Sequence, residues 1–138
     1  MNPQKNSPVN LGSTDAAFVL TIHTEELFSE PSITGHLAFF INNGKNQPMC
    51  KKFFFLAFDD AICGDKQAQV FWIEAVKSNS ATIFPARKCT DYNQFEARKC
   101  DENFPVGHMN LHTPTNMTGK YFLNTFDTSP YSRSLAEP

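Results

Sequence analysis

The chain has 138 residues, of which 41% are hydrophobic, and a formal net charge of -2 at pH 7. This length suits one domain with a modest core, and the 14 phenylalanines exclude a disordered tail. The small net charge gives no reason to expect nucleic acid or an anionic membrane as a partner. No apolar run approaches the roughly 20 residues of a transmembrane helix, so no transmembrane segment is expected.

Three apolar, β-rich segments predict strands. "FVLTIH" at 18–23 predicts a strand buried on both faces. "GHLAFFI" at 35–41 predicts a second strand, closed by the turn signal Asn42-Asn43-Gly44, and "KYFLNTF" at 120–126 predicts a third. Between Cys50 and Cys63, the segment "KKFFFLAFDDAI" is expected to form an apolar loop.

One helix is predicted to begin near Asp65. The apolar residues after it follow the spacing of a helix with one buried face, at Ala68, Phe71, Trp72, Ala75 and Val76. Asp65 stands where an N-cap residue belongs, with a carboxylate able to accept from the free N–H groups of the first turn. Trp72 and Phe71 are expected to be core residues rather than parts of a ligand site.

The cysteines indicate an exported protein. Cys50, Cys63, Cys89 and Cys100 contain no C-x-x-C pair, so two disulfides are expected rather than a zinc cluster. Three pairings remain open, and the nearest-neighbour pairing would close two loops of similar size, each worth ~3 kcal/mol.

A sequon and the N-terminus also bear on export. Asn116-Met117-Thr118 is an acceptor triplet for N-glycosylation. The N-terminal residues lack the apolar stretch of a signal peptide, which conflicts with the cysteines. We therefore expect that Met1 is not the start of the natural secreted polypeptide.

The histidines do not predict a metal site. His108 and His112 are four residues apart, as two ligands on one helical face would be. Pro105, Gly107 and Pro114 argue against a helix there. Neither a metal nor another cofactor is predicted.

Five segments together resemble one family. The chain is similar to the secreted neutral lipases, a family that includes pancreatic-type lipases, insect lipases, phospholipases A1 and the non-catalytic insect yolk proteins. The segments occur in the family's order over nearly the whole chain: "DAAFVLTIHT" (15–24), "GHLAFFINNGKNQPMC" (35–50), "FPARKCTDYNQFEARKC" (84–100), "GKYFLNT" (119–125) and "SPYSR" (129–133). The resemblance implies an α/β fold, a partial α/β-hydrolase (lipase) fold over residues 1–138 that lacks the N-terminal half and its nucleophile elbow.

The resemblance also implies that the catalytic triad is degenerate. No G-x-S-x-G nucleophile motif occurs in the chain. The family's triad acid lies in a Leu-Asp-Pro motif, and Asn2 holds the matching place in Met1-Asn2-Pro3. The family's base is a histidine two residues after the second lid cysteine, a position that Asp65 occupies, whereas His23 and His36 match structural positions. Catalysis by this chain is therefore not expected.

The family pattern assigns further roles. It pairs Cys50 with Cys63 around the lid, residues 50–63, and pairs Cys89 with Cys100. The lid is short and apolar, which suits contact with a lipid surface through a set of residues that could equally pack as core: Phe53, Phe54, Phe55, Leu56 and Phe58. The sequence departs from the pattern at Ala38, where the family usually has an aspartate.

These observations predict a secreted, extracellular lipase-like protein or fragment without catalytic machinery, which associates with or stores lipid. The alternative is a fragment of a carboxylic ester hydrolase, a triacylglycerol lipase or phospholipase A1, whose N-terminal half lies upstream of Met1. A third alternative is an incomplete gene product without a stable function. In each case the strands that would flank 18–23 are missing from the chain, so we expect an open sheet edge and self-association.

Overall fold

The computed structural model describes residues 12–24, 35–45, 47–48, 50 and 57–135. Residues 57–62 and 65 are described by their backbone alone. Several predictions therefore lie outside the described residues. These are the triad-acid position Asn2 and the lid side chains Phe53, Phe54, Phe55, Leu56 and Phe58.

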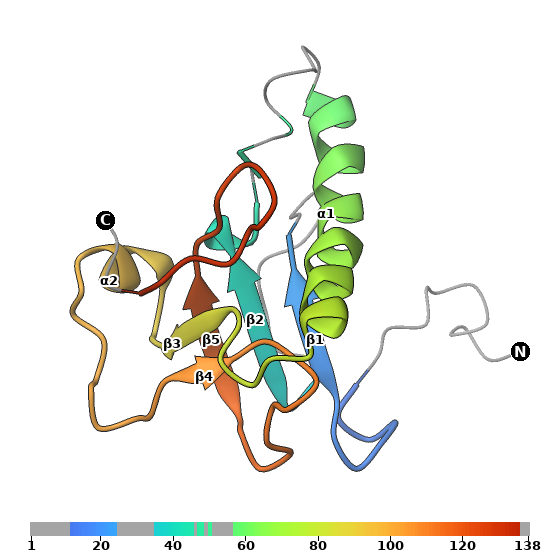
Figure 1. Ribbon diagram of the computed structural model, residues 1–138. Helices are drawn as coiled ribbons and strands as arrows, with labels where there is room; N and C mark the ends of the chain where they lie inside the picture. Colours follow the sequence, from blue (N-terminus) through green and yellow to red (C-terminus); the bar gives the residue numbers. More distant parts are fainter. Residues whose placement is uncertain (1–11, 25–34, 46, 49, 51–56, 136–138) are drawn as a thin grey trace, which may run out of the picture.

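A mixed sheet forms the centre of the described structure (Figure 1). Its strands lie in the order β1-β2-β5-β3-β4, with β1 at Leu20–His23, β2 at Leu37–Ile41, β5 at Gly119–Leu123, β3 at Pro85–Lys88 and β4 at Gly107–His108. β1, β2 and β5 are parallel, whereas β3 is antiparallel to both β5 and β4. The three strands predicted from the sequence are present, and the parallel pairs agree with the expected α/β class.

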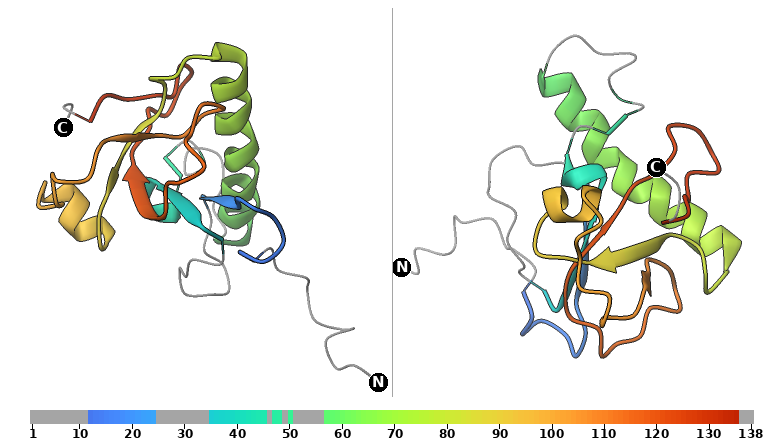
Figure 2. Two further views of the ribbon diagram at one scale, coloured as in Figure 1. Left: turned by 90° about the horizontal axis from the view of Figure 1, so that it is seen from below. Right: turned by 90° about the vertical axis from the view of Figure 1, so that its left-hand side faces the viewer.

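The strand β2 is buried on both sides because helices pack on both faces of the sheet. The larger of two hydrophobic clusters contains Leu37, Phe39 and Ile41 of β2. It also contains Phe71 of helix α1, which spans Ala57–Ser78. The alternate residues of β2 point to the opposite face, where Phe40 and Phe122 pack with the short helix α2 at Tyr92–Glu96. Figure 2 shows α1 lying along one side of the sheet.

Helix α1 begins earlier than the sequence predicted. It starts at Ala57, so residues 57–62 are helical and the expected loop does not extend to Cys63. Asp65 lies inside the helix and is not its N-cap, because residues before it already form helical turns. The prediction placed the start at Asp65 because the apolar spacing began at Ala68, whereas the buried stripe already includes Gly64 and continues through Gln67 and Phe71.

The face of α1 is close to the prediction, with one difference. Phe71 and Ala75 are buried, and the half-buried Trp72 packs against the larger cluster, so it is a core residue as expected. Val76 is 40% exposed and is not part of the buried face, which corrects its predicted place. Among the described residues, none of the helices has the length and apolar character of a membrane span.

The strand β1 lies at one edge of the sheet, pairing only with β2 among the described residues. Its residues are half-buried, so the prediction of burial on both faces is wrong for 20–23. An edge strand lacks a neighbour on one side, which explains the greater exposure. The edge that the sequence predicted is thus present in the described fold.

Candidate functional site

The carboxyl ends of the three parallel strands define the candidate site. Because β1, β2 and β5 run in one direction, their last residues meet at one edge of the sheet (Figure 1). Open sheets of this kind bind ligands outside that edge. Thr24 directly follows β1, Asn42 directly follows β2, and Thr125 lies two residues after the end of β5.

A buried polar network joins these three strand ends. The Nδ2 atom of Asn42 donates to Gln47 Oε1 at 2.8 Å and to Thr125 Oγ1 at 2.9 Å. The Nε2 atom of Gln47 donates to the carbonyl oxygens of Thr24 and Ile41, each at 2.9 Å. Gln47 is 1% exposed, so these bonds satisfy groups that water does not reach.

The turn after β2 brings Gln47 into this network. Asn42, Asn43 and Gly44 have φ values of 53°, 68° and 70°, in the left-handed region. Asparagine and glycine tolerate this conformation better than other residues, which agrees with the turn predicted from their sequence. The turn reverses the direction of the chain, so the Gln47 side chain lies next to Ile41 at the carboxyl end of β2.

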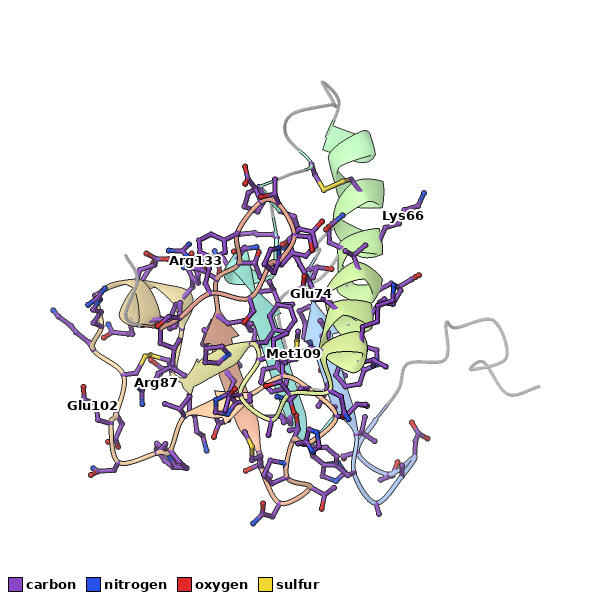
Figure 3. The ribbon with its side chains drawn as sticks, in the orientation of Figure 1. Lys66, Glu74, Arg87, Glu102, Met109 and Arg133 are labelled. Carbon is purple, nitrogen blue, oxygen red and sulfur yellow. A yellow bond between two sulfur atoms is a disulfide. The ribbon has the colours of Figure 1, made fainter. Side chains whose placement is uncertain are left out.

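The predicted disulfide between Cys50 and Cys63 links α1 to the segment that follows the Gln47 network at the carboxyl ends of the parallel strands. Cys50 is bonded to Cys63 with an S–S distance of 2.09 Å, and Cys89 is bonded to Cys100, which confirms the expected pairing. Figure 3 draws one disulfide beside the upper turns of α1 and the other beside the loop that follows α2. The two ends of the lid are therefore held by the polar network before Cys50 and by the helix at Cys63.

Position 65, which the resemblance identified with the triad base, lies in α1 two residues after the bonded Cys63. Close to it, Gln67 is 5% exposed on the buried side of the helix. Its Oε1 atom has no hydrogen-bond partner among the described residues. A buried acceptor of this kind was not apparent from the sequence, because the pattern of apolar residues began at Ala68.

A cleft of about 530 Å³ lies beside the carboxyl end of β5. It is bordered by β3, α2 and the C-terminal segment, and charged side chains of both signs line it: Arg87, Glu96, Arg98 and Glu102. Burial and the neighbouring Glu96 raise the pKa of Tyr92 to about 12, and its hydroxyl donates to Asn124 Oδ1 at 2.9 Å. The mixture of charges gives the cleft no preference for an anion or a cation.

The histidines occupy structural positions in this fold. The His23 ring stacks on Phe40 with ring centroids 4.6 Å apart, and burial lowers its pKa. The Nδ1 atom of His36 accepts from the backbone N–H of Val19 at 2.9 Å. His112 places Nε2 3.2 Å from the carbonyl oxygen of Asn79, which follows α1. No group of three His, Cys, Asp or Glu side chains gathers in the described part as a metal site would require.

Glu74 is a further residue that sequence reasoning missed. Its carboxylate accepts from the backbone N–H of Tyr131 at 2.9 and 3.0 Å and from the Ser129 hydroxyl at 3.1 Å. The ring of Tyr131 packs edge-on against Phe71. This contact fastens the "SPYSR" segment to α1, although 57 residues separate Glu74 from Tyr131, and no local pattern could reveal it.

Comparison with known proteins identifies the family. A family model described as "Lipase" matches residues 2–131. The chain is 30% identical over 151 residues to the dog (Canis lupus familiaris) protein named "Inactive pancreatic lipase-related protein 1", covering 91% of this chain and 32% of that protein. It is also 30% identical over 154 residues to human (Homo sapiens) "Pancreatic triacylglycerol lipase", with the same coverage of 91% and 32%.

Human "Phospholipase A1 member A" is 32% identical over 96 residues, which are 68% of this chain and 20% of that protein. The chain thus spans about a third or less of the length of these curated relatives. The expected resemblance is confirmed over most of the chain: this protein belongs to the lipase family.

Proposed function

We propose that this chain is a non-catalytic, lipid-associating member of the lipase family. The observation that carries the proposal is the residue at position 65, two residues after the disulfide-bonded Cys63. The family pattern has a histidine there, whereas this chain has aspartate. The chain also contains no G-x-S-x-G motif, and Asn2 stands at the position of the triad acid.

Chemistry supports the loss of the base. An aspartate has an ordinary pKa of about 3.9, compared with about 6.5 for histidine, so a carboxylate is a weak proton acceptor near neutral pH. Without a serine nucleophile there is no hydroxyl for such a base to activate. A curated relative of this chain, in dog, carries the word "Inactive" in its name, which is consistent with loss of catalysis within the family.

The lid supplies the means of lipid association in this proposal. Its sequence is rich in phenylalanine, and its two ends are fastened by the Gln47 network and by the Cys50–Cys63 disulfide. A short apolar segment with fixed ends presents its side chains to a lipid surface at a small cost in conformational entropy. The destination of the chain is then extracellular, as the disulfides also favour.

Two measurements on the purified, oxidised chain test the proposal. Flotation with phosphatidylcholine vesicles and with a triolein emulsion is expected to recover the protein with the lipid. A triple variant, Phe53→Ser with Phe54→Ser and Phe55→Ser, is expected to stay in the aqueous fraction. Phe104→Ser is the control, because Phe104 is an exposed phenylalanine, at 41%, that lies outside the lid.

Hydrolysis of a soluble ester is measured beside flotation, for the parent chain and for Asp65→His. Neither protein is expected to exceed the uncatalysed rate, because restoring one triad member leaves the nucleophile missing. Turnover by the parent chain that a serine-directed inhibitor abolishes would overturn the proposal. If the triple variant and the parent chain are recovered equally with lipid, the lid is not the part of the chain that binds lipid.

The second candidate function is ester hydrolysis by a longer protein that includes this chain. It is favoured by the coverage of the relatives, since this chain corresponds to only 32% of human pancreatic triacylglycerol lipase. The sequence upstream of Met1 distinguishes the two candidates. A signal peptide followed by an in-frame G-x-S-x-G would support the hydrolase, whereas a signal peptide without that motif would support the binding protein.

A further inference from the structure

Asn116 lies at the end of the molecule opposite the candidate site. It belongs to the turn between β4 and β5, which Figure 1 shows at the amino end of β5. The backbone N–H of Met117 donates to the carbonyl oxygen of Pro114 at 3.3 Å, which closes the turn. The candidate site is at the other end of β5, where Thr125 joins the polar network.

The turn exposes to solvent the two residues that define the sequon, Asn116 and Thr118. Asn116 and Thr118 are exposed, whereas Met117 between them is half-buried against the larger hydrophobic cluster. A Cβ atom at Gly107 would lie 2.6 Å from Met117 Cε, so the methionine fills the space that this glycine leaves. Met117 is thus held inward, while its two neighbours in the triplet are exposed.

The side chains of Asn116 and Thr118 are also available for reaction. Neither makes a hydrogen bond to another residue within the part of the chain that the structure describes. The sequence contains no second Asn-X-Ser/Thr triplet, since every other asparagine lacks serine or threonine two positions later. The acceptor chemistry is thus confined to one exposed turn.

We propose that Asn116 carries an N-linked glycan. The inference rests on the proposed extracellular destination, because the chain must enter the secretory pathway to meet its co-reactant, an oligosaccharide linked to a lipid pyrophosphate. The carboxamide nitrogen of Asn116 forms a bond to the anomeric carbon of the first sugar. The bond from that carbon to the pyrophosphate oxygen breaks, the lipid pyrophosphate leaves, and the nitrogen loses one proton to the phosphate or to water.

A glycan at this turn leaves the candidate site open. The lid is fastened at the carboxyl ends of the parallel strands, whereas Asn116 precedes the amino end of β5. The sugar chain therefore extends away from the surface that is proposed to meet lipid. It adds solvated bulk to an end of the molecule where Leu111, in the same connection, is 54% exposed.

The test expresses the full 138-residue chain behind a heterologous signal peptide in cultured animal cells. Cell lysate and medium are both analysed, so retention inside the cell does not hide the result. Peptide N-glycosidase is expected to shift the parent chain to higher mobility, and tryptic peptide mass spectrometry is expected to find deamidated Asn116 after that treatment. Asn116→Gln and Thr118→Ala are expected to abolish the shift, whereas Thr118→Ser is expected to retain it.

The control variants separate modification from folding. Thr118→Ser keeps the hydroxyl that the Asn-X-Ser/Thr triplet requires, so its shift shows that a change at position 118 does not by itself prevent modification. A parent chain without any glycosidase-sensitive shift would overturn the glycan proposal. Because the signal peptide imposes entry into the pathway, that result would leave the natural destination to be decided by the sequence upstream of Met1.

Discussion

Asn42 and Thr125 make two hydrogen bonds to each other across the carboxyl ends of β2 and β5. The backbone N–H of Thr125 donates to Asn42 Oδ1 at 3.0 Å, and Asn42 Nδ2 donates to Thr125 Oγ1 at 2.9 Å. The residues are 83 positions apart in the chain. One amide side chain thus holds two neighbouring strand ends and, through Gln47, the start of the lid.

Asn42→Asp is expected to destabilise the fold. The variant replaces the Nδ2 donor with a carboxylate oxygen that repels the acceptor Gln47 Oε1, although aspartate still tolerates the left-handed φ. Loss of these buried bonds predicts a decrease of about 2–3 kcal/mol in the free energy of unfolding, measured by urea denaturation. Asn43→Asp is the matched control, with a left-handed φ of 68°, and its expected change is within ~0.5 kcal/mol. Equal effects of the two substitutions would show that the network does not stabilise this edge.

Glu74→Ala is expected to release the C-terminal segment from α1. The substitution leaves the backbone N–H groups of Tyr131 and Ser132 without their carboxylate acceptor. Hydrogen bonds to a charged group predict a loss of about 1.5–3 kcal/mol on urea unfolding, and limited proteolysis is expected to cleave near residue 131 sooner. Figure 3 labels a suitable control, Glu102, which is exposed on the loop after the second disulfide. The expectation fails if Glu102→Ala and Glu74→Ala are equally stable.

Either disulfide is expected to contribute a similar amount of stability. The bonded cysteines are 13 and 11 positions apart, and the entropy of closing a loop changes slowly with its length. Cys50→Ala with Cys63→Ala, and separately Cys89→Ala with Cys100→Ala, should each lose about 3 kcal/mol by urea denaturation. The oxidised parent chain, which keeps both disulfides, is the comparison for both double variants. A pair whose removal leaves the unfolding midpoint unchanged would contradict the prediction.

The stability of the fold is expected to fall as the pH is lowered through the ordinary histidine range. Burial lowers the pKa values of His23 and His108 below the ordinary histidine value of about 6.5. As the pH falls through that value, the unfolded chain takes up protons that the folded chain resists, so the free energy of unfolding decreases until the folded-state pKa is passed. Above the unfolded-state pKa of about 6.5, these histidines are neutral in both states and their full contribution to stability is present.

Urea midpoints between about pH 7.5 and about pH 5.5 measure this decrease. His23→Gln is expected to flatten the dependence on pH, and His23→Gln with His108→Gln is expected to flatten it further. Any packing cost, including loss of the stacking on Phe40, appears as a constant offset already present at the higher pH. An unchanged slope in the double variant would show that other groups control this dependence.

Local sequence patterns were sufficient for β1, β2 and β5, for the existence of α1 and for the turn at 42–44, but they did not predict β3, β4 or α2. Five successive apolar residues produced β2, which is buried throughout, and alternation of residues along it supplies both hydrophobic clusters. The pairing of the cysteines required the resemblance to the family, since spacing alone left three choices. The predicted helix start was wrong because the apolar spacing used for it began at Ala68, whereas the helix starts at Ala57 and already has a buried residue at Gly64.

The sequence by itself determined the segments that bury apolar surface, the lipase family and the missing serine motif, because these depend on residue type and on short spacings. Only the tertiary structure decided which polar residues act together. Asn42, Gln47 and Thr125 meet because parallel strands align their carboxyl ends, and Glu74 reaches Tyr131 because α1 packs beside the C-terminal segment. Such contacts join residues far apart in the chain, and a buried polar group takes whichever partner the packed elements bring within hydrogen-bond distance.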